Sequence, residues 1–140
     1  MVVLLLPLAG CGNHDAGVPT GCREGESTVL GALARAPAPV RVDGAAISKC
    51  FARAASSADV QNIGSTYIDV AQRLADQARS APHSAAALRL GYLIGAVRRG
   101  AGRDFGVYYE THRRLEAVLA GIDVNSPEFV RGERAGERSG

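Results

Sequence analysis

The chain has 140 residues, a length that suits one domain, and 46% of them are hydrophobic although only 5% are aromatic and none is tryptophan. A core of small aliphatic side chains suits closely packed helices better than a sandwich or a barrel, so we predict an all-α fold. The formal net charge of +2 is too small to indicate a nucleic-acid-binding protein, and we expect no such partner.

The chain begins with an apolar run over residues 2–8 that turns polar directly after Cys11. A run of about seven residues is too short to span a bilayer, which needs roughly 20. It is long enough for the apolar region of a signal peptide. The sequence Leu8-Ala9-Gly10-Cys11 resembles the lipobox of bacterial lipoproteins. The resemblance implies that residues 1–10 are removed and that Cys11 carries a lipid, which holds an exported protein on the extracytoplasmic side of the cell membrane.

The signal differs from the family pattern in one respect. Lipoprotein signals carry Lys or Arg before the apolar region, whereas Val2 directly follows Met1 in this chain. We therefore expect a truncated amino-terminal region of the signal. The resemblance covers eleven residues and assigns the domain behind them to no family. A secreted protein without lipid is the alternative interpretation.

Two further cysteines, Cys22 and Cys50, remain once Cys11 is assigned to the lipid. An even pair in an exported protein predicts a disulfide bond between them. The alternative is a pair of buried free thiols in a cytosolic protein. Residues 11–21 are rich in glycine and polar side chains, and they predict a flexible tether between the lipid and a helical domain over 22–131. The charged, glycine-rich residues 132–140 predict a disordered tail.

Apolar residues at helical spacing predict the principal elements of the domain. A short helix is expected at about 44–56, with Asp43 as its N-cap and Cys50 on its buried face. A long helix follows at about 59–80, where the apolar stripe is uninterrupted and Pro82 ends the pattern. We expect this helix to form a hairpin with the region 83–121, and the short helix at 44–56 to pack beside the hairpin.

The pattern resumes after residue 83 and is interrupted by glycines between residues 100 and 106. We expect residues 83–121 to form one long helix, with a bend accommodated near 100–102. In such a helix four glycines fall on one face and let another backbone approach closely. Two helices with a turn at that point are the alternative. The glycines in question are Gly91, Gly95, Gly102 and Gly106. After Gly121, Ser126 and Pro127 predict the start of one further helical turn.

His112 is the candidate for chemistry, because it lies on the apolar stripe with Glu116 one turn further on. It would act as a catalytic base or metal ligand oriented by Glu116, or else as a partly buried histidine with a structural hydrogen bond. Neither a zinc-type spacing of Cys and His nor a phosphate-binding or dinucleotide fingerprint is present, so the sequence calls for no metal and no cofactor.

Arginines form the densest basic feature of the chain. Beside a membrane anchor they would bind anionic lipid headgroups or an anionic envelope polymer. The alternative is a solvated helix face paired with neighbouring carboxylates. The residues concerned are Arg98, Arg99, Arg103, Arg113 and Arg114.

These patterns together predict a small cell-envelope lipoprotein that acts as a binding or structural module for an envelope protein or an anionic polymer. The alternative function is an envelope or secreted enzyme, or an accessory of one, with His112 in a pocket.

Overall fold

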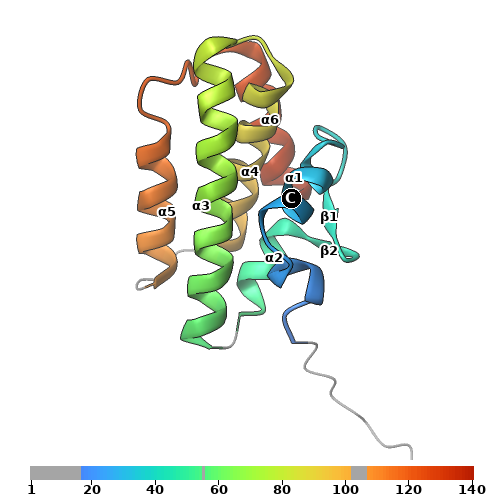
Figure 1. The fold of residues 1–140 in the computed structure, drawn as a ribbon. Coiled ribbons are helices and arrows are strands. Elements are labelled where there is room, and N and C mark those ends of the chain that lie inside the picture. The colour runs from blue at the N-terminus through green and yellow to red at the C-terminus, as the bar shows by residue number, and fades with distance from the viewer. Residues whose placement is uncertain (1–16, 55, 102–106) are drawn as a thin grey trace, which may run out of the picture.

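Within residues 17–54, 56–101 and 107–140, which the computed structural model describes, four helices run alternately up and down through the protein (Figure 1). They are α3 (Ser57–Ser80), α4 (Ala85–Ala101), α5 (Val107–Val118) and α6 (Pro127–Ser139). α4 is the central element, because it contacts α2, α3, α5 and α6. The predicted all-α class is confirmed.

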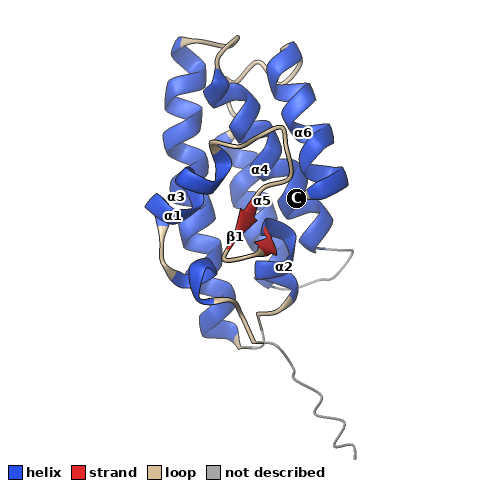
Figure 2. Cartoon of the chain, turned by 90° about the vertical axis from the view of Figure 1, so that its right-hand side faces the viewer, coloured by secondary structure: helices blue, strands red, loops and turns tan. Residues whose placement is uncertain are grey.

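Shorter elements cover one side of this bundle (Figure 2). β1 and β2 pair antiparallel, with Val42 opposite Ala45, and the turn between them is Asp43-Gly44 with φ of 50° and 76°. Positive φ at both central residues is what a tight hairpin turn requires. The elements are the 3-10 helix η1 (Thr20–Arg23), α1 (Glu26–Leu33), β1 (Arg41–Val42), β2 (Ala45–Ala46) and α2 (Ile47–Ala52).

The long helix predicted at 59–80 is confirmed as α3, and its start has a side-chain cap. The hydroxyl of Ser56 accepts a hydrogen bond from the Asp59 amide at 3.1 Å, which pairs one of the free amides of the first turn. The short helix predicted at 44–56 is α2, but it is only six residues long. Its predicted cap, Asp43, lies instead in the hairpin turn, because β2 takes up the residues that precede Ile47.

The region 83–121 contains two helices, so the interpretation as one long helix is wrong and its alternative is correct. α4 ends at Ala101, and α5 begins at Val107 and runs in the opposite direction beside α3 (Figure 1). α5 ends at Val118, three residues before the predicted end at 121. Gly121 has a φ of 75°, which side chains disfavour, so the chain leaves the helical conformation there.

Two glycines of the predicted stripe, Gly91 and Gly95, do admit a second backbone, and that backbone belongs to α6. A Cβ atom on Gly91 would lie 2.2 Å from the carbonyl oxygen of Phe129, and one on Gly95 would lie 2.1 Å from that of Glu133. Real Cβ atoms do not approach so closely, so only glycine fits at these positions. Gly102 and Gly106 lie outside the described residues.

Glycines of α6 in turn admit the backbone of α4, and the disordered tail predicted at 132–140 is wrong. Residues 127–139 form α6, whose Gly132 and Gly136 face the backbone of α4. A Cβ atom on Gly132 would lie 1.9 Å from the carbonyl oxygen of Leu88. The helix begins as predicted at Ser126, whose hydroxyl accepts from the Phe129 amide at 3.4 Å.

The boundary between tether and domain also needs correction. It was predicted at Cys22, but Val18 belongs to the hydrophobic core and Gly21 is buried. A Cβ atom on Gly21 would lie 2.7 Å from the Cβ of Asp43, so η1 packs directly on the hairpin turn. Those residues of the predicted tether that the structure describes, 17–21, therefore include part of the folded domain.

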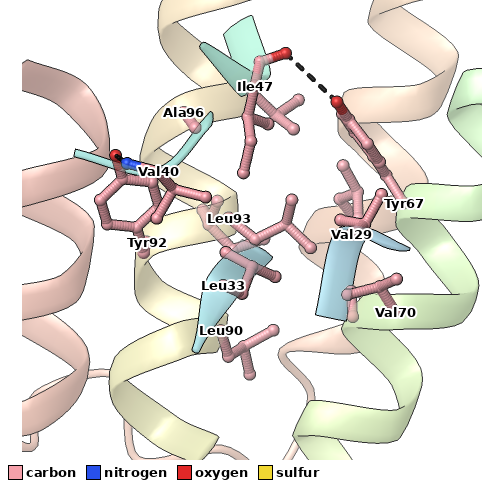
Figure 3. Packing of buried hydrophobic residues seen from close by; sticks show 14 of the residues in the cluster. Val29, Leu33, Val40, Ile47, Tyr67, Val70, Leu90, Tyr92, Leu93 and Ala96 are labelled. Carbon is pink, nitrogen blue, oxygen red and sulfur yellow. Dashed lines mark hydrogen bonds between the residues drawn. The ribbon is translucent and has the colours of Figure 1, made fainter. Parts of the chain in front are cut away.

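The core contains two buried tyrosines whose hydroxyl groups pair with the main chain (Figure 3). The Tyr67 hydroxyl donates to the carbonyl oxygen of Ile47 at 3.2 Å. The Tyr92 hydroxyl accepts from the Val40 amide at 2.9 Å and lies 3.3 Å from the Ser139 hydroxyl. Because Ser139 donates to its own helix, the Tyr92 hydroxyl donates to Ser139, and one side chain ties the hairpin segment to α4 and α6.

Replacing Tyr92 with phenylalanine should lower the free energy of unfolding by about 1–2 kcal/mol, because the buried Val40 amide would lose the hydroxyl oxygen to which it donates. Urea unfolding followed by circular dichroism measures this change. Tyr109 is 59% exposed, so Tyr109→Phe is the matched control and should leave stability unchanged. An equal effect of the two substitutions would contradict the role given to the Tyr92 hydroxyl.

Candidate functional site

His112 lies on α5 and is about one-third exposed. Its Nε2 atom is 3.4 Å from the Oε1 atom of Glu116, one helical turn further on, as the sequence spacing predicted. Glu116 is therefore placed to orient the imidazole.

The same carboxylate has a second partner, in agreement with the alternative interpretation in which the arginines pair with neighbouring carboxylates. Arg98 of α4 donates to the Oε1 atom of Glu116 from Nε at 3.1 Å and from Nη2 at 2.6 Å. Through Nη1 it also donates to Glu133 of α6. Burial of the guanidinium lowers the Arg98 pKa, but the hydrogen bonds and charges of Glu116 and Glu133 outweigh burial, so the pKa lies above its ordinary value. The arrangement fastens α4, α5 and α6 together.

Arg98→Gln should lower the free energy of unfolding by about 1–2 kcal/mol, because two neighbouring carboxylates would lose the cation that separates them. Thermal or urea unfolding at neutral pH measures the loss. Arg113→Gln removes the same charge from an exposed pair with Glu110 and should cause no measurable change. If both substitutions destabilise equally, net charge rather than the bridge between helices is responsible.

The arginine cluster expected from the sequence is not brought together as one free surface. Arg98 forms the bridge described above, and Arg99 Nη1 donates to the carbonyl oxygens of Glu137, at 3.2 Å, and Arg138 at the end of α6. Arg113 and Arg114 both pair with Glu110, at 3.0 and 2.8 Å. Arg103 lies outside the described residues.

Hydrogen bonds from Arg113 and Arg114 lower the pKa of Glu110 to about 2. The contribution of these exposed pairs to stability is small. It is present above the ordinary pKa of a glutamate and is lost as the pH falls toward 2. An NMR titration of the Glu110 carboxyl carbon should give a midpoint near this value, and Arg113→Gln/Arg114→Gln should return it to the ordinary range. A midpoint that the double substitution leaves unmoved would contradict the assignment.

An open groove of about 1050 Å³ runs between α3 and α5. α5 lies close to α3 there because Gly64 has no side chain: a Cβ atom would lie 2.9 Å from the hydroxyl of Thr111. His112 is not among the residues that line it, although its neighbour Thr111 is. The lining consists of Ala58, Gln61, Asn62, Gly64, Ser65, Ile68, Asp69, Glu110, Thr111 and Arg114.

A second hollow, of about 690 Å³, lies where α2, the hairpin and the ends of α4 and α6 meet. Four cationic side chains line it, and we call it the cationic pocket. Sequence reasoning missed it because its cations come from three separate stretches of the chain, and only Lys49 and Arg53 show a helical spacing. The four residues are Arg41, Lys49, Arg53 and Arg99.

The predicted disulfide bond between Cys22 and Cys50 is confirmed. Both cysteines are fully buried, and the bond joins η1 to α2. Cys11 lies outside the described residues. Across residues 17–54, 56–101 and 107–140, no helix is long and apolar enough to cross a membrane, and no group of three or more His, Cys, Asp or Glu side chains is placed to hold a metal ion.

Comparison with known proteins gives no match: no family model, no curated protein and no solved structure resembles the chain significantly. Functional interpretation therefore depends on the residues themselves.

Proposed function

We propose that the protein is a lipid-anchored module of the bacterial cell envelope, exported and held on the extracytoplasmic side of the membrane by a lipid on Cys11. The observation that supports it best is the buried Cys22–Cys50 disulfide. Disulfides persist in oxidising compartments and are rare in the cytosol. An oxidising location agrees with export directed by the lipobox-like sequence that ends at Cys11.

We further propose that the domain acts by binding rather than by catalysis, with an envelope protein or an anionic polymer as its partner. The groove between α3 and α5 is open, and its lining combines the apolar side chains of Ala58 and Ile68 with charged side chains. The competing function, an envelope enzyme or accessory, would use His112. That imidazole does not line the groove, and the carboxylate beside it is already engaged by Arg98.

Expression of the full chain in a bacterium with lipoprotein-processing enzymes tests the anchor. The wild-type protein should sediment with membranes, and its intact mass should equal the chain from Cys11 plus a diacylglycerol group. Cys11→Ser should lack that mass and the cleavage before residue 11. A wild-type mass without lipid would favour the alternative, a secreted protein. Alkylation of Cys22 and Cys50 in the absence of reductant would contradict export.

Site-specific photo-crosslinking tests the binding role of the groove. A photoreactive amino acid at Gln61, which lines the groove, should give a discrete crosslinked species in intact cells. The same amino acid at Arg131, exposed on α6, is the matched control and should not. Equal crosslinking at both positions, or none at Gln61, would count against the groove as a docking surface.

A further inference from the structure

The cationic pocket differs from the other basic parts of the protein in its lack of carboxylate partners. Arg98, Arg113 and Arg114 each form an ion pair with a glutamate. Among the ion pairs of the described residues, none involves a cation of this pocket, and one carboxylate, that of Asp43, is in its lining. Four cationic side chains therefore share a hollow with a single acidic side chain.

The donors of the pocket are also only partly used. Arg41 Nη1 donates to the carbonyl oxygen of Gly44 at 3.2 Å, and Arg99 Nη1 donates to a main-chain carbonyl oxygen at the end of α6. A guanidinium carries five N–H donors and an ammonium three, so both arginines retain further donors. Lys49 and Arg53 are both exposed, and their side chains form no hydrogen bond with the other described residues. Their donors are therefore available to a ligand.

Like charges gathered in a hollow raise its positive potential, and an anion bound there would lower it. Tetrahedral oxyanions suit these side chains, because arginine donates in a fork that matches phosphate oxygens and lysine adds a point charge. We propose that the cationic pocket binds a phosphate group. Of the arginines that the sequence analysis singled out, only Arg99 belongs to this site.

The phosphate could come from a lipid headgroup or from a free phosphate compound, and the location of the pocket favours the headgroup. Cys22 joins η1 to α2, which carries Lys49, and Gly21 of η1 packs on Asp43 at the edge of the pocket. The chain from Cys11 to Gly17 spans at most about 20 Å, so an anchor at Cys11 would hold this end of the domain close to headgroups. This preference for lipid rests on the proposed anchor, whereas the phosphate site itself does not.

The test uses the full chain with Cys11→Ser, purified in a neutral detergent, so that binding does not depend on the lipid. Inorganic phosphate is titrated by NMR, and flotation compares vesicles of phosphatidylcholine with vesicles that also contain phosphatidylglycerol. Lys49→Gln/Arg53→Gln should weaken phosphate binding by about tenfold or more. Arg113→Gln/Arg114→Gln lowers the net charge equally and should leave binding intact. Circular dichroism verifies that each variant is folded, and Arg41→Gln provides an independent variant of the pocket.

Binding of phosphatidylglycerol vesicles that only the pocket variants lose would assign the site to headgroups. Binding of inorganic phosphate alone, with the same dependence on the variants, would assign it to a free phosphate compound. Equal losses in the pocket and control variants would reduce the effect to general charge attraction and overturn the proposal, as would the absence of binding to either probe. Because Cys11 is already replaced, failure here leaves the anchor unaffected, and loss of the anchor leaves the phosphate result standing.

Discussion

Gly132→Val should lower the free energy of unfolding by about 3 kcal/mol, because the first side-chain atom would meet the backbone of α4. The ideal Cβ position lies 1.9 Å from the carbonyl oxygen of Leu88 and 2.9 Å from the Tyr92 amide nitrogen. Backbone atoms cannot rotate away as a side chain can, so α6 has to separate from α4. Urea unfolding measures the loss, and hydrogen exchange should show α6 opening before α3.

Gly31→Ala provides the control for this prediction. Gly31 lies within α1, and a Cβ atom there would meet nothing within 4 Å. Alanine should therefore stabilise the protein, by about 0.5–1 kcal/mol, through its better helix propensity and a less flexible unfolded chain. If Gly132→Val is tolerated as well as Gly31→Ala, α6 is not packed against α4 in the way described.

Cys22→Ala/Cys50→Ala should lower the free energy of unfolding by about 3–4 kcal/mol. The bond closes a loop with a sequence separation of 28, and releasing the loop restores entropy to the unfolded chain. The loss is of the same order as the stability of many small domains, so the variant should unfold near physiological temperature. Thermal unfolding with and without reductant measures the effect.

Reductant should destabilise the wild-type protein about as much as the double substitution does, and it should not affect the double variant further. Cys11→Ser is the matched control, because it removes a thiol that takes no part in the bond, and its unfolding should match that of the wild type. An undiminished response to reductant in the double variant would show that another thiol is responsible.

Elements whose hydrophobic pattern, cap and end all lie within one stretch of sequence could be predicted from that stretch alone. α3 has a continuous apolar stripe, a serine cap at Ser56 and a proline soon after its end, and its predicted bounds are correct to within two residues at the start. The Cys22–Cys50 bond followed from counting cysteines once Cys11 had been assigned. In both cases, no knowledge of the partner element was needed.

α6 was missed because its signal is meaningful only beside α4. Read alone, residues 132–140 are charged and rich in glycine, which is the composition of a disordered segment. Yet Gly132 and Gly136 repeat the spacing of Gly91 and Gly95, and the two pairs pack against each other's backbones. The glycine-rich composition of α6 disfavours a helix, but packing against α4 compensates for the poor helix propensity of glycine. The same four-residue spacing of glycines in both segments was the sequence signal that could have predicted their packing.

The candidate sites were harder to predict than the fold, because charge pairing depends on which helices become neighbours. The sequence placed Glu116 beside His112 correctly, since both lie on one helix. It could not place Arg98 beside Glu116, because their approach depends on the reversal between α4 and α5. In the cationic pocket, Lys49 and Arg53 gain cationic neighbours only when α2, the hairpin and the end of α4 come together.

The disulfide also determines how the protein would carry mechanical load. If the protein is anchored at Cys11 as proposed, a force on the anchor would enter the described domain at Gly17 and follow the shortest covalent route. At Cys22 that route crosses to Cys50, so tension passes directly into α2 and the residues after it. The segment between the two cysteines, which contains α1 and the hairpin, lies outside this route and would carry little of the force. The Cys22–Cys50 bond would thus prevent a force on the anchor from separating these small elements from the helical bundle.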